Sequence, residues 1–181
     1  FWSVVIVGAF VALARFSEAF VVLRVQQGGL TVALVPLVLV MLNLVYSATA
    51  YPFGYWSDRV SRHGLLAGGL LVLILADAAL AMWASGWGVW AGVALWGLHM
   101  GMTQGLLATL VAQSAPSELR GTAFGLFNLV SGIAMLVASV LAGLLWDTVG
   151  APATFLAGAG ACVIAILLIF TLRWSDPQRS I

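Results

Sequence analysis

The chain has 181 residues, of which 63% are hydrophobic and 7% are charged, and its formal net charge is +1 at pH 7. Because soluble domains carry roughly 25% charged residues, this composition excludes an ordinary soluble protein and indicates an integral membrane protein. The small net charge provides no basic field for a nucleic-acid partner. The single cysteine, Cys162, excludes a disulfide or a thiolate metal site within one chain.

Long apolar runs separated by short polar breaks predict six membrane-spanning segments. They cover residues 1–25, 31–53, 64–83, 87–112, 121–146 and 151–173. At about 1.5 Å of helical rise per residue, runs of this length can cross a bilayer. Hydrocarbon offers no partner to a free backbone amide, so each run must be a helix. We therefore expect an all-α, polytopic membrane protein with six transmembrane helices.

The chain begins inside its first apolar run, without an initiating methionine, a basic segment or a cleavage site. Such a start is not typical of a signal peptide. We therefore expect the chain to be part of a longer protein.

Three charged residues interrupt the first predicted span. An ionisable group within a span costs at least ~2.5 to 3.5 kcal/mol unless it is paired or hydrated. Glu18 follows Arg15 by three residues, so a continuous helix would place both on one face, where they partly neutralise each other. One interpretation is a cavity-facing site in which Arg15 binds an anionic group and Glu18 accepts a proton or cation. The other is a paired strut against a second bundle, while Arg24 is expected to snorkel to the water boundary.

Two polar residues share one face of the second span. Asn43 and Tyr46 are three positions apart, and Pro36 on the same span frees backbone carbonyl groups. We expect Asn43 and Tyr46 to line a cavity, and the alternative is an interhelical hydrogen bond.

The third and fourth spans carry further ionisable and polar side chains. Asp77, in the third span, is interpreted as a structural partner of Arg15, with a coupling role as the alternative. In the fourth span His99 and Thr103 are four positions apart, and Gln104 is adjacent. Because histidine titrates near neutral pH, His99 is a candidate for substrate contact or pH sensing. The alternative is a buried, neutral and hydrogen-bonded histidine.

The fifth span contains Asn128, Ser131 and Ser139 together with Gly125, Gly132 and Gly143. Small and hydroxyl-bearing residues allow close approach of membrane helices. We interpret this set as packing residues.

The connection between the second and third spans holds Arg59 and Arg62 beside Asp58. Basic residues in a short connection predict that it faces the cytoplasm. Strict alternation then places the connection near Arg120 and both termini on the same side.

An internal repeat relates the two halves of the predicted bundle. Gly54, Asp58 and Ser61 recur, with the same spacing, as Gly143, Asp147 and Gly150. Each copy lies between the second and third helices of a three-helix set. Sets with an odd number of spans cross the membrane in opposite senses, so we expect two inverted three-helix repeats, which are typical of transporters.

The connection also resembles a known family motif. Gly54, Asp58, Arg59, Arg62 and His63 are similar to the cytoplasmic signature of the major facilitator superfamily, roughly G-x-x-x-D-R-x-G-R-[RK]. The fifth span begins with a second family-like pattern, formed by Pro116, Arg120, Gly121, Ala123 and Gly125.

Two departures from the motif indicate which copy it resembles. Ser61 replaces a glycine and His63 replaces the last basic residue, as in the less strict copy of the family's second half. The resemblance therefore implies the C-terminal six-helix half of a twelve-helix fold, with the first half missing. Gly101 stands where the family's R-x-x-Q-G coupling pattern has arginine, so that role does not transfer to this chain.

The resemblance implies a secondary active transporter of a small solute, working by alternating access and coupled to protons or ions. It implies a cytoplasmic gate formed by Gly54, Asp58, Arg59 and Arg62. The expected partners are membrane lipid, the solute, and an N-terminal six-helix half or a second membrane subunit. The expected location is a bacterial inner membrane.

Motifs of enzymes and cofactor sites are absent from the sequence. There is no P-loop, no H-E-x-x-H motif, no G-x-S-x-G elbow and no cluster of metal ligands, so we expect neither an enzyme nor a cofactor. A non-transporting scaffold or partner subunit is the alternative function. A channel is disfavoured because no ring of like charges or filter-type loop is present.

Overall fold

The computed structural model describes residues 1–57 and 59–171, and these residues form seven α-helices and two short 3-10 helices. The helices are α1 (Trp2–Ala14), α2 (Ala19–Gln27), α3 (Val35–Ser57), α4 (Arg62–Met82), α5 (Gly86–Gln113), α6 (Arg120–Thr148) and α7 (Ala151–Thr171), with η1 (Val32–Leu34) before α3 and η2 (Ser117–Leu119) before α6. The prediction of an all-α fold is confirmed.

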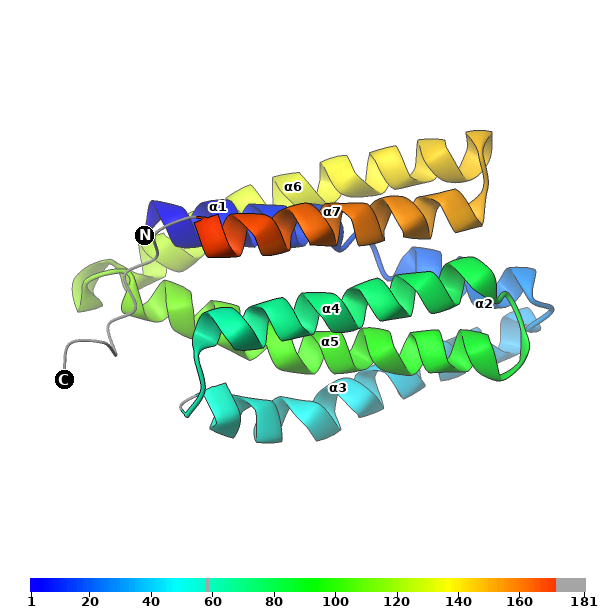
Figure 1. Ribbon diagram of the computed structural model, residues 1–181, viewed down its shortest axis with the longest axis horizontal. Coiled ribbons are helices and arrows are strands. Elements are labelled where there is room, and N and C mark those ends of the chain that lie inside the picture. The colour runs from blue at the N-terminus through cyan, green and yellow to red at the C-terminus, as the bar shows by residue number, and fades with distance from the viewer. Residues whose placement is uncertain (58, 172–181) are drawn as a thin grey trace.

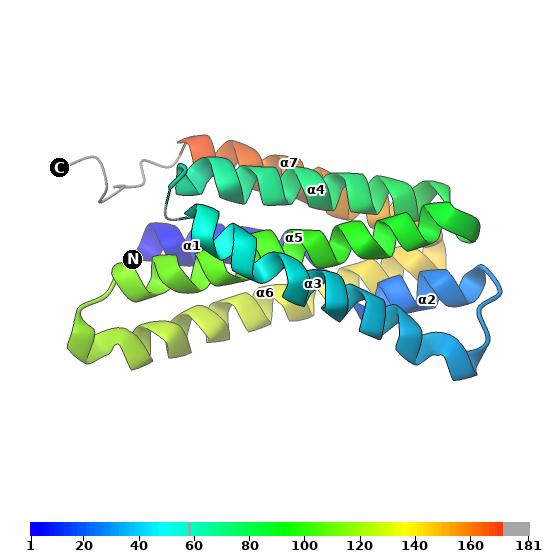
Figure 2. The same cartoon turned by 90° about the horizontal axis from the view of Figure 1, so that it is seen from below.

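The helices lie side by side along one axis, and successive spans run in opposite directions (Figures 1 and 2). The N-terminus, the α3–α4 connection and the α5–α6 connection lie at one end of the bundle. The α2–α3, α4–α5 and α6–α7 connections lie at the other end. With α1 and α2 counted as one interrupted span, the chain passes along the bundle six times.

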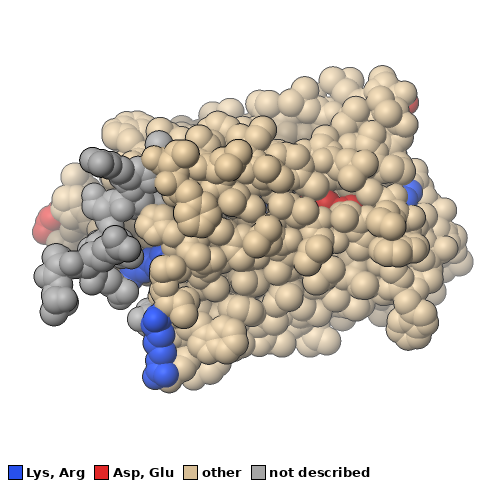
Figure 3. All heavy atoms as spheres, viewed as in Figure 1, with Lys and Arg blue, Asp and Glu red and all other residues tan. Residues whose placement is uncertain are grey.

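Within residues 1–57 and 59–171, five segments are long and apolar enough to cross a membrane: Trp2–Gln27, Val32–Ser57, Arg62–Met82, Ser117–Thr148 and Ala151–Thr171. Helix α5 is not among them, although its 28 residues give it the necessary length. Its glycines, tryptophans and polar residues make it less apolar than its neighbours. The long surface in Figure 3 shows one acidic patch between the two ends and is otherwise almost free of charged side chains, and the other charged side chains lie towards the two ends of the bundle.

Helices α4 and α5 form the centre of the bundle. Helix α4 packs against α5 and α7, α5 also packs against α3, and α1 packs against α6 and α7. The α3–α5 contact is close because α5 presents glycines to α3. A Cβ atom at Gly97 would lie 2.5 Å from the Leu42 carbonyl oxygen. Helices α3 and α6 are the least buried spans, so each presents a broad apolar surface outside the bundle.

The first span differs from the uninterrupted helix expected over residues 1–25. Helix α1 ends at Ala14, and α2 begins at Ala19. The backbone amide of Ser17 donates to Ser139 Oγ on α6 at 3.2 Å, and the Ala19 amide donates to Ser17 Oγ at 3.3 Å. Side-chain hydroxyl groups thus accept from amides that a continuous helix would bond to carbonyl oxygens.

The interruption also corrects the expected geometry of Arg15 and Glu18. Because residues 15–18 are not helical, a spacing of three no longer places the two side chains on one helix face. The charges are close enough to interact through space. No hydrogen bond or salt bridge joins them in the part of the chain that the structure describes.

Candidate functional site

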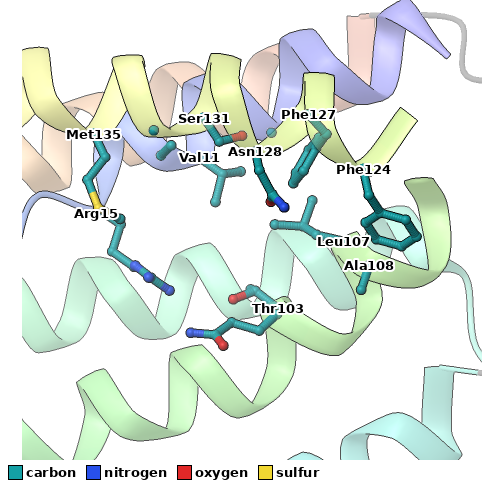
Figure 4. A pocket seen from close by; sticks show the side chains of 14 residues that line it. Val11, Arg15, Thr103, Leu107, Ala108, Phe124, Phe127, Asn128, Ser131 and Met135 are labelled. Carbon is teal, nitrogen blue, oxygen red and sulfur yellow. The ribbon is translucent and has the colours of Figure 1, made fainter. Parts of the chain in front are cut away.

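A cavity of about 360 Å³ lies between α1, α5 and α6, close to the interruption of the first span (Figure 4). Its lining residues are Gly8, Val11, Ala12 and Arg15 from the first span, Thr103, Gln104, Leu107 and Ala108 from α5, and Phe124, Phe127, Asn128, Ser131, Gly132 and Met135 from α6. Ligand pockets of membrane and soluble proteins combine such apolar walls with a few convergent polar groups.

Arg15 supplies the positive charge of this cavity. It follows directly after α1, and its side chain extends into the cavity beside Met135 (Figure 4). The guanidinium forms no hydrogen bond or salt bridge with another described residue. A cation at the C-terminal end of a helix is favoured by the helix dipole. No carboxylate of the described residues lines the cavity, so its charged group is available to an anion.

Uncharged polar groups face the same space. Neither Gln104 nor Asn128 forms a side-chain hydrogen bond with other described residues, so both amides are free. Ser131 Oγ is buried and likewise has no partner in the described part of the chain. The Thr103 hydroxyl, in contrast, already donates to the His99 carbonyl oxygen at 2.9 Å. The cavity therefore combines one cation with three unpaired polar groups.

Comparison with known families agrees with this architecture. The model of the Major Facilitator Superfamily matches residues 4–180 of the chain. The chain belongs to the Major Facilitator Superfamily. This is a family of membrane transporters, and the family resemblance noted in the sequence is confirmed.

Known members of the superfamily are longer than this chain. The MFS-type transporter MJ1317 of Methanocaldococcus jannaschii is 30% identical over 171 residues, which are 91% of this chain and 43% of the relative. The inner membrane transport protein YajR of Escherichia coli is 28% identical over 152 residues, 84% of this chain and 32% of YajR. The chain thus spans less than half of each of these relatives.

A solved structure shows the same fold. The crystal structure of the POT family transporter PepTSo superposes with a TM-score of 0.72 at 16% sequence identity. The superposition covers 93% of this chain and 36% of PepTSo.

The structure of this superfamily member separates the substrate and coupling residues predicted from sequence. Arg15 and Gln104 line the cavity, whereas Glu18 is half-buried at the interruption outside the lining. Asn43 is exposed on α3, and its Nδ2 donates to the Leu39 carbonyl oxygen of the same helix at 2.8 Å. Tyr46, on the same helix, packs against the hydrophobic core.

His99 lies outside the cavity. It is fully buried between α5 and α4, and its Nδ1 lies 2.8 Å from the Gly69 carbonyl oxygen. A carbonyl oxygen only accepts, so Nδ1 carries the proton in this contact. This arrangement favours the alternative of a neutral, hydrogen-bonded histidine.

Two cavity residues were interpreted from sequence as packing residues. Asn128 and Ser131 lie on the α6 face that lines the cavity, together with Gly132 and Met135. Their spacing of three, four and seven positions marks one helix face. This spacing is visible in the sequence, and it would have predicted the polar lining.

Asp77 does not contact Arg15 as expected. It is fully buried on α4, and neither carboxylate oxygen has a hydrogen-bond partner among the described residues. The prediction that Arg24 snorkels is wrong, because its side chain is only 8% exposed and binds the end of α4. Its Nε donates to the Leu80 carbonyl oxygen, and its Nη2 donates to that of Ala81.

The expected gate motif is only partly described. Asp58 lies outside the described residues. The Arg59 guanidinium stacks on the Tyr55 ring, 4.1 Å from its centroid, and Arg62 is buried and donates to Gln113 Oε1 at the end of α5. Gly54 is exposed, with open space where a side chain would project.

Proposed function

We propose that this chain is the C-terminal six-helix half of a twelve-helix secondary transporter, which moves a small solute by alternating access. The length of the chain supports its assignment as one half of such a transporter, because the chain covers 43% of MJ1317 and 36% of PepTSo. The apolar, weakly buried surfaces of α3 and α6 provide an area against which a second bundle can pack.

The cavity lined by Arg15, Gln104 and Asn128 is the proposed half-site for the solute. Its single cation and its lack of a carboxylate favour a solute that carries a carboxylate or another anionic group. The free amides and the Ser131 hydroxyl would bind its uncharged polar groups. The position of Arg15 in this cavity is the observation that carries the proposal.

We place the end of the bundle that carries the α3–α4 and α5–α6 connections in the cytoplasm. These connections contain Arg59, Arg62 and Arg120, and basic residues concentrate on the cytoplasmic side. In this orientation Gly54, Asp58, Arg59 and Arg62 form a gate that docks against the other half. The N-terminal half and membrane lipid are then the partners of the chain, and transport is coupled to a proton or ion gradient.

A ligand screen on the purified full-length protein tests the solute class. Thermal unfolding is measured with small carboxylates and with their neutral amides. Carboxylates should raise the unfolding temperature, and Arg15→Gln should abolish this shift. Arg120→Gln is the matched control, because Arg120 is exposed at the start of α6 and does not line the cavity. Stabilisation by carboxylates that survives Arg15→Gln would reject Arg15 as the anion-binding group.

Water access separates a transporter from a non-transporting scaffold. Cysteines are introduced at Asn128 and at Gln104 after replacement of the buried Cys162 by serine. A transporter should expose both positions to a charged thiol reagent, and bound solute should protect them. If neither cysteine reacts with the reagent and no solute changes this, the result would favour the non-transporting scaffold.

A further inference from the structure

Asp77 is a buried acidic group without a partner in the described structure. Its exposed fraction is 0%, and no hydrogen bond reaches Oδ1 or Oδ2. It lies on α4, and it does not line the cavity that contains Arg15. Buried polar groups in folded proteins are nearly always hydrogen-bonded, so an unpaired buried carboxyl group requires an explanation.

Gly158 on α7 is in close contact with both Asp77 and the end of α1. A Cβ atom at Gly158 would lie 2.9 Å from Asp77 Oδ2, 2.8 Å from Phe16 Cε1 and 3.5 Å from the Ala14 carbonyl oxygen. The Asp77 carboxyl group and the Ala14 carbonyl oxygen therefore both lie close to the Cβ position of Gly158. The interruption also leaves this carbonyl without the hydrogen bond that a continuous helix would supply, since the Glu18 amide does not donate to it.

The other titratable groups around Asp77 do not neutralise it. Arg15 extends into the cavity, and Glu18 is itself acidic. Arg24 is engaged with the carbonyl groups of Leu80 and Ala81, one turn further along α4. Two titratable groups lie on the neighbouring helices α5 and α7. His99 of α5 contacts the Gly69 carbonyl oxygen, and the Cys162 thiol of α7 is buried.

An ionised carboxylate removed from water without a partner is strongly destabilised, and such groups become neutral by binding a proton. A protonated carboxyl group has an O–H donor, and the Ala14 carbonyl oxygen is an unused acceptor nearby. A metal ion requires more oxygen ligands than these two groups supply, and no cluster of three or more His, Cys, Asp or Glu side chains occurs in the described residues.

We propose that Asp77 is a proton-binding site that controls the interruption of the first span. In the protonated state the carboxyl group donates to the Ala14 carbonyl oxygen and stabilises the interrupted conformation. Loss of the proton to water leaves a carboxylate that repels this carbonyl oxygen and destabilises the interrupted conformation. Because Arg15 directly follows Ala14, the proton changes the position of the cavity's cation. The inference rests on the proposed transport function and names the coupling ion and its site.

Infrared difference spectroscopy of the purified full-length protein tests the protonation directly and requires no solute. The C=O stretch of a neutral carboxyl group should disappear as the pH is raised, and Asp77→Asn should remove this band. Asp147→Asn is the matched control, since Asp147 is exposed at the end of α6. A spectrum unchanged by Asp77→Asn would overturn the proposal.

A second measurement follows the interruption itself. A cysteine at Ala12, in the last turn of α1, is labelled at several pH values in a Cys162→Ala background, because Cys162 is close to Asp77 and alanine adds no hydroxyl group there. At each pH the rate is divided by that of an exposed reference cysteine, because thiol reactivity itself rises with pH. This ratio should depend on pH in this background and should stay at its low-pH value after Asp77→Asn. A rate that depends on sodium concentration and not on pH would contradict a proton site. A pH dependence of the ratio that survives Asp77→Asn would contradict the role of Asp77.

A glycine pair keeps the test informative if Asp77→Asn does not fold. Gly158→Ala places a methyl group against Asp77 Oδ2 and Phe16, whereas Gly160→Ala on the same helix meets no atom within 4 Å. Gly158→Ala should shift the carboxyl band and abolish the pH-dependent labelling, and Gly160→Ala should preserve both. Equal effects of the two variants would overturn the proposal. A positive band together with no transport of any solute would reject only the transport function.

Discussion

Arg24 on α2 binds the backbone of α4 at its C-terminal end, where Nε lies 2.7 Å from the Leu80 carbonyl oxygen and Nη2 lies 3.0 Å from the Ala81 carbonyl oxygen. A third donor, Nη1, reaches Gln27 Oε1 at 3.2 Å. Helix α2 has only nine residues, a length that is marginal without tertiary contacts. The guanidinium therefore connects the short second part of the interrupted span to the centre of the bundle.

Arg24→Lys is expected to destabilise the protein by about 1.5 to 3 kcal/mol, because a single ammonium group cannot form both carbonyl contacts in the same geometry. Thermal unfolding in detergent measures the change. Arg120→Lys is the control, because Arg120 is exposed and its side chain forms no hydrogen bond with the described residues. Equal unfolding temperatures for the two variants would show that the Arg24 contacts contribute little.

A pair of glycines on α5 tests the contact with α3. Gly101→Ala should destabilise by about 1 to 3 kcal/mol, since a methyl group there would overlap the Thr49 hydroxyl and approach the α3 backbone. Gly105→Ala, one turn later, meets no atom within 4 Å and should be neutral or stabilising by up to about 1 kcal/mol. Under one set of conditions, the unfolding temperature of Gly101→Ala should fall below that of the unmodified protein. The unfolding temperature of Gly105→Ala should stay the same or rise. A loss of stability in Gly105→Ala would contradict the described packing.

The overall architecture was accessible from the sequence because two strong signals determine it. Runs of apolar residues long enough to cross a bilayer predicted the helices, and hydrocarbon permits no other spanning structure for a single chain segment of this length. The family resemblance of Gly54, Arg59 and Arg62 then indicated the superfamily that the match over residues 4–180 establishes.

The interruption of the first span was not accessible, because no proline or glycine marks it. The segment Arg15-Phe16-Ser17-Glu18 contains ordinary residues, and its conformation depends on Ser139, which lies 122 positions later in the chain. A contact between such distant residues overrides the local preference for helix. The prediction that Arg15 and Glu18 share one helix face depended on a continuous helix and was wrong for this reason, although the two charges still interact through space.

The candidate site was predicted in part. Arg15 and Gln104 were candidates because polar groups within membrane spans are costly and therefore informative. The placement of Asn43 and His99 required side-chain conformations that the sequence does not contain. Asn43 Nδ2 and His99 Nδ1 bond to the Leu39 and Gly69 carbonyl oxygens, so helix spacing alone cannot distinguish these two residues from cavity residues.

A histidine pair tests the structural interpretation of His99. Asparagine places a donor near the position of the histidine Nδ1, so His99→Asn should retain the contact with the Gly69 carbonyl oxygen, and His99→Leu should lose it. We expect His99→Leu to be less stable than His99→Asn by about 0.6 to 1.7 kcal/mol, the range of hydrogen bonds between membrane helices. The unfolding temperature in detergent measures this difference. Equal stability would indicate that the contact is unimportant.

Two serines on α6 test what maintains the interruption of the first span. Ser139 Oγ accepts the backbone N–H of Ser17, so Ser139→Ala leaves a part-buried amide without its partner. We expect a loss of about 0.6 to 1.7 kcal/mol and faster hydrogen exchange of the Ser17 amide. Ser131→Ala is the matched control, because Ser131 Oγ has no partner among the described residues and its removal should leave stability unchanged. Slow exchange at Ser17 after Ser139→Ala would mean that the interruption is maintained by packing of its side chains instead.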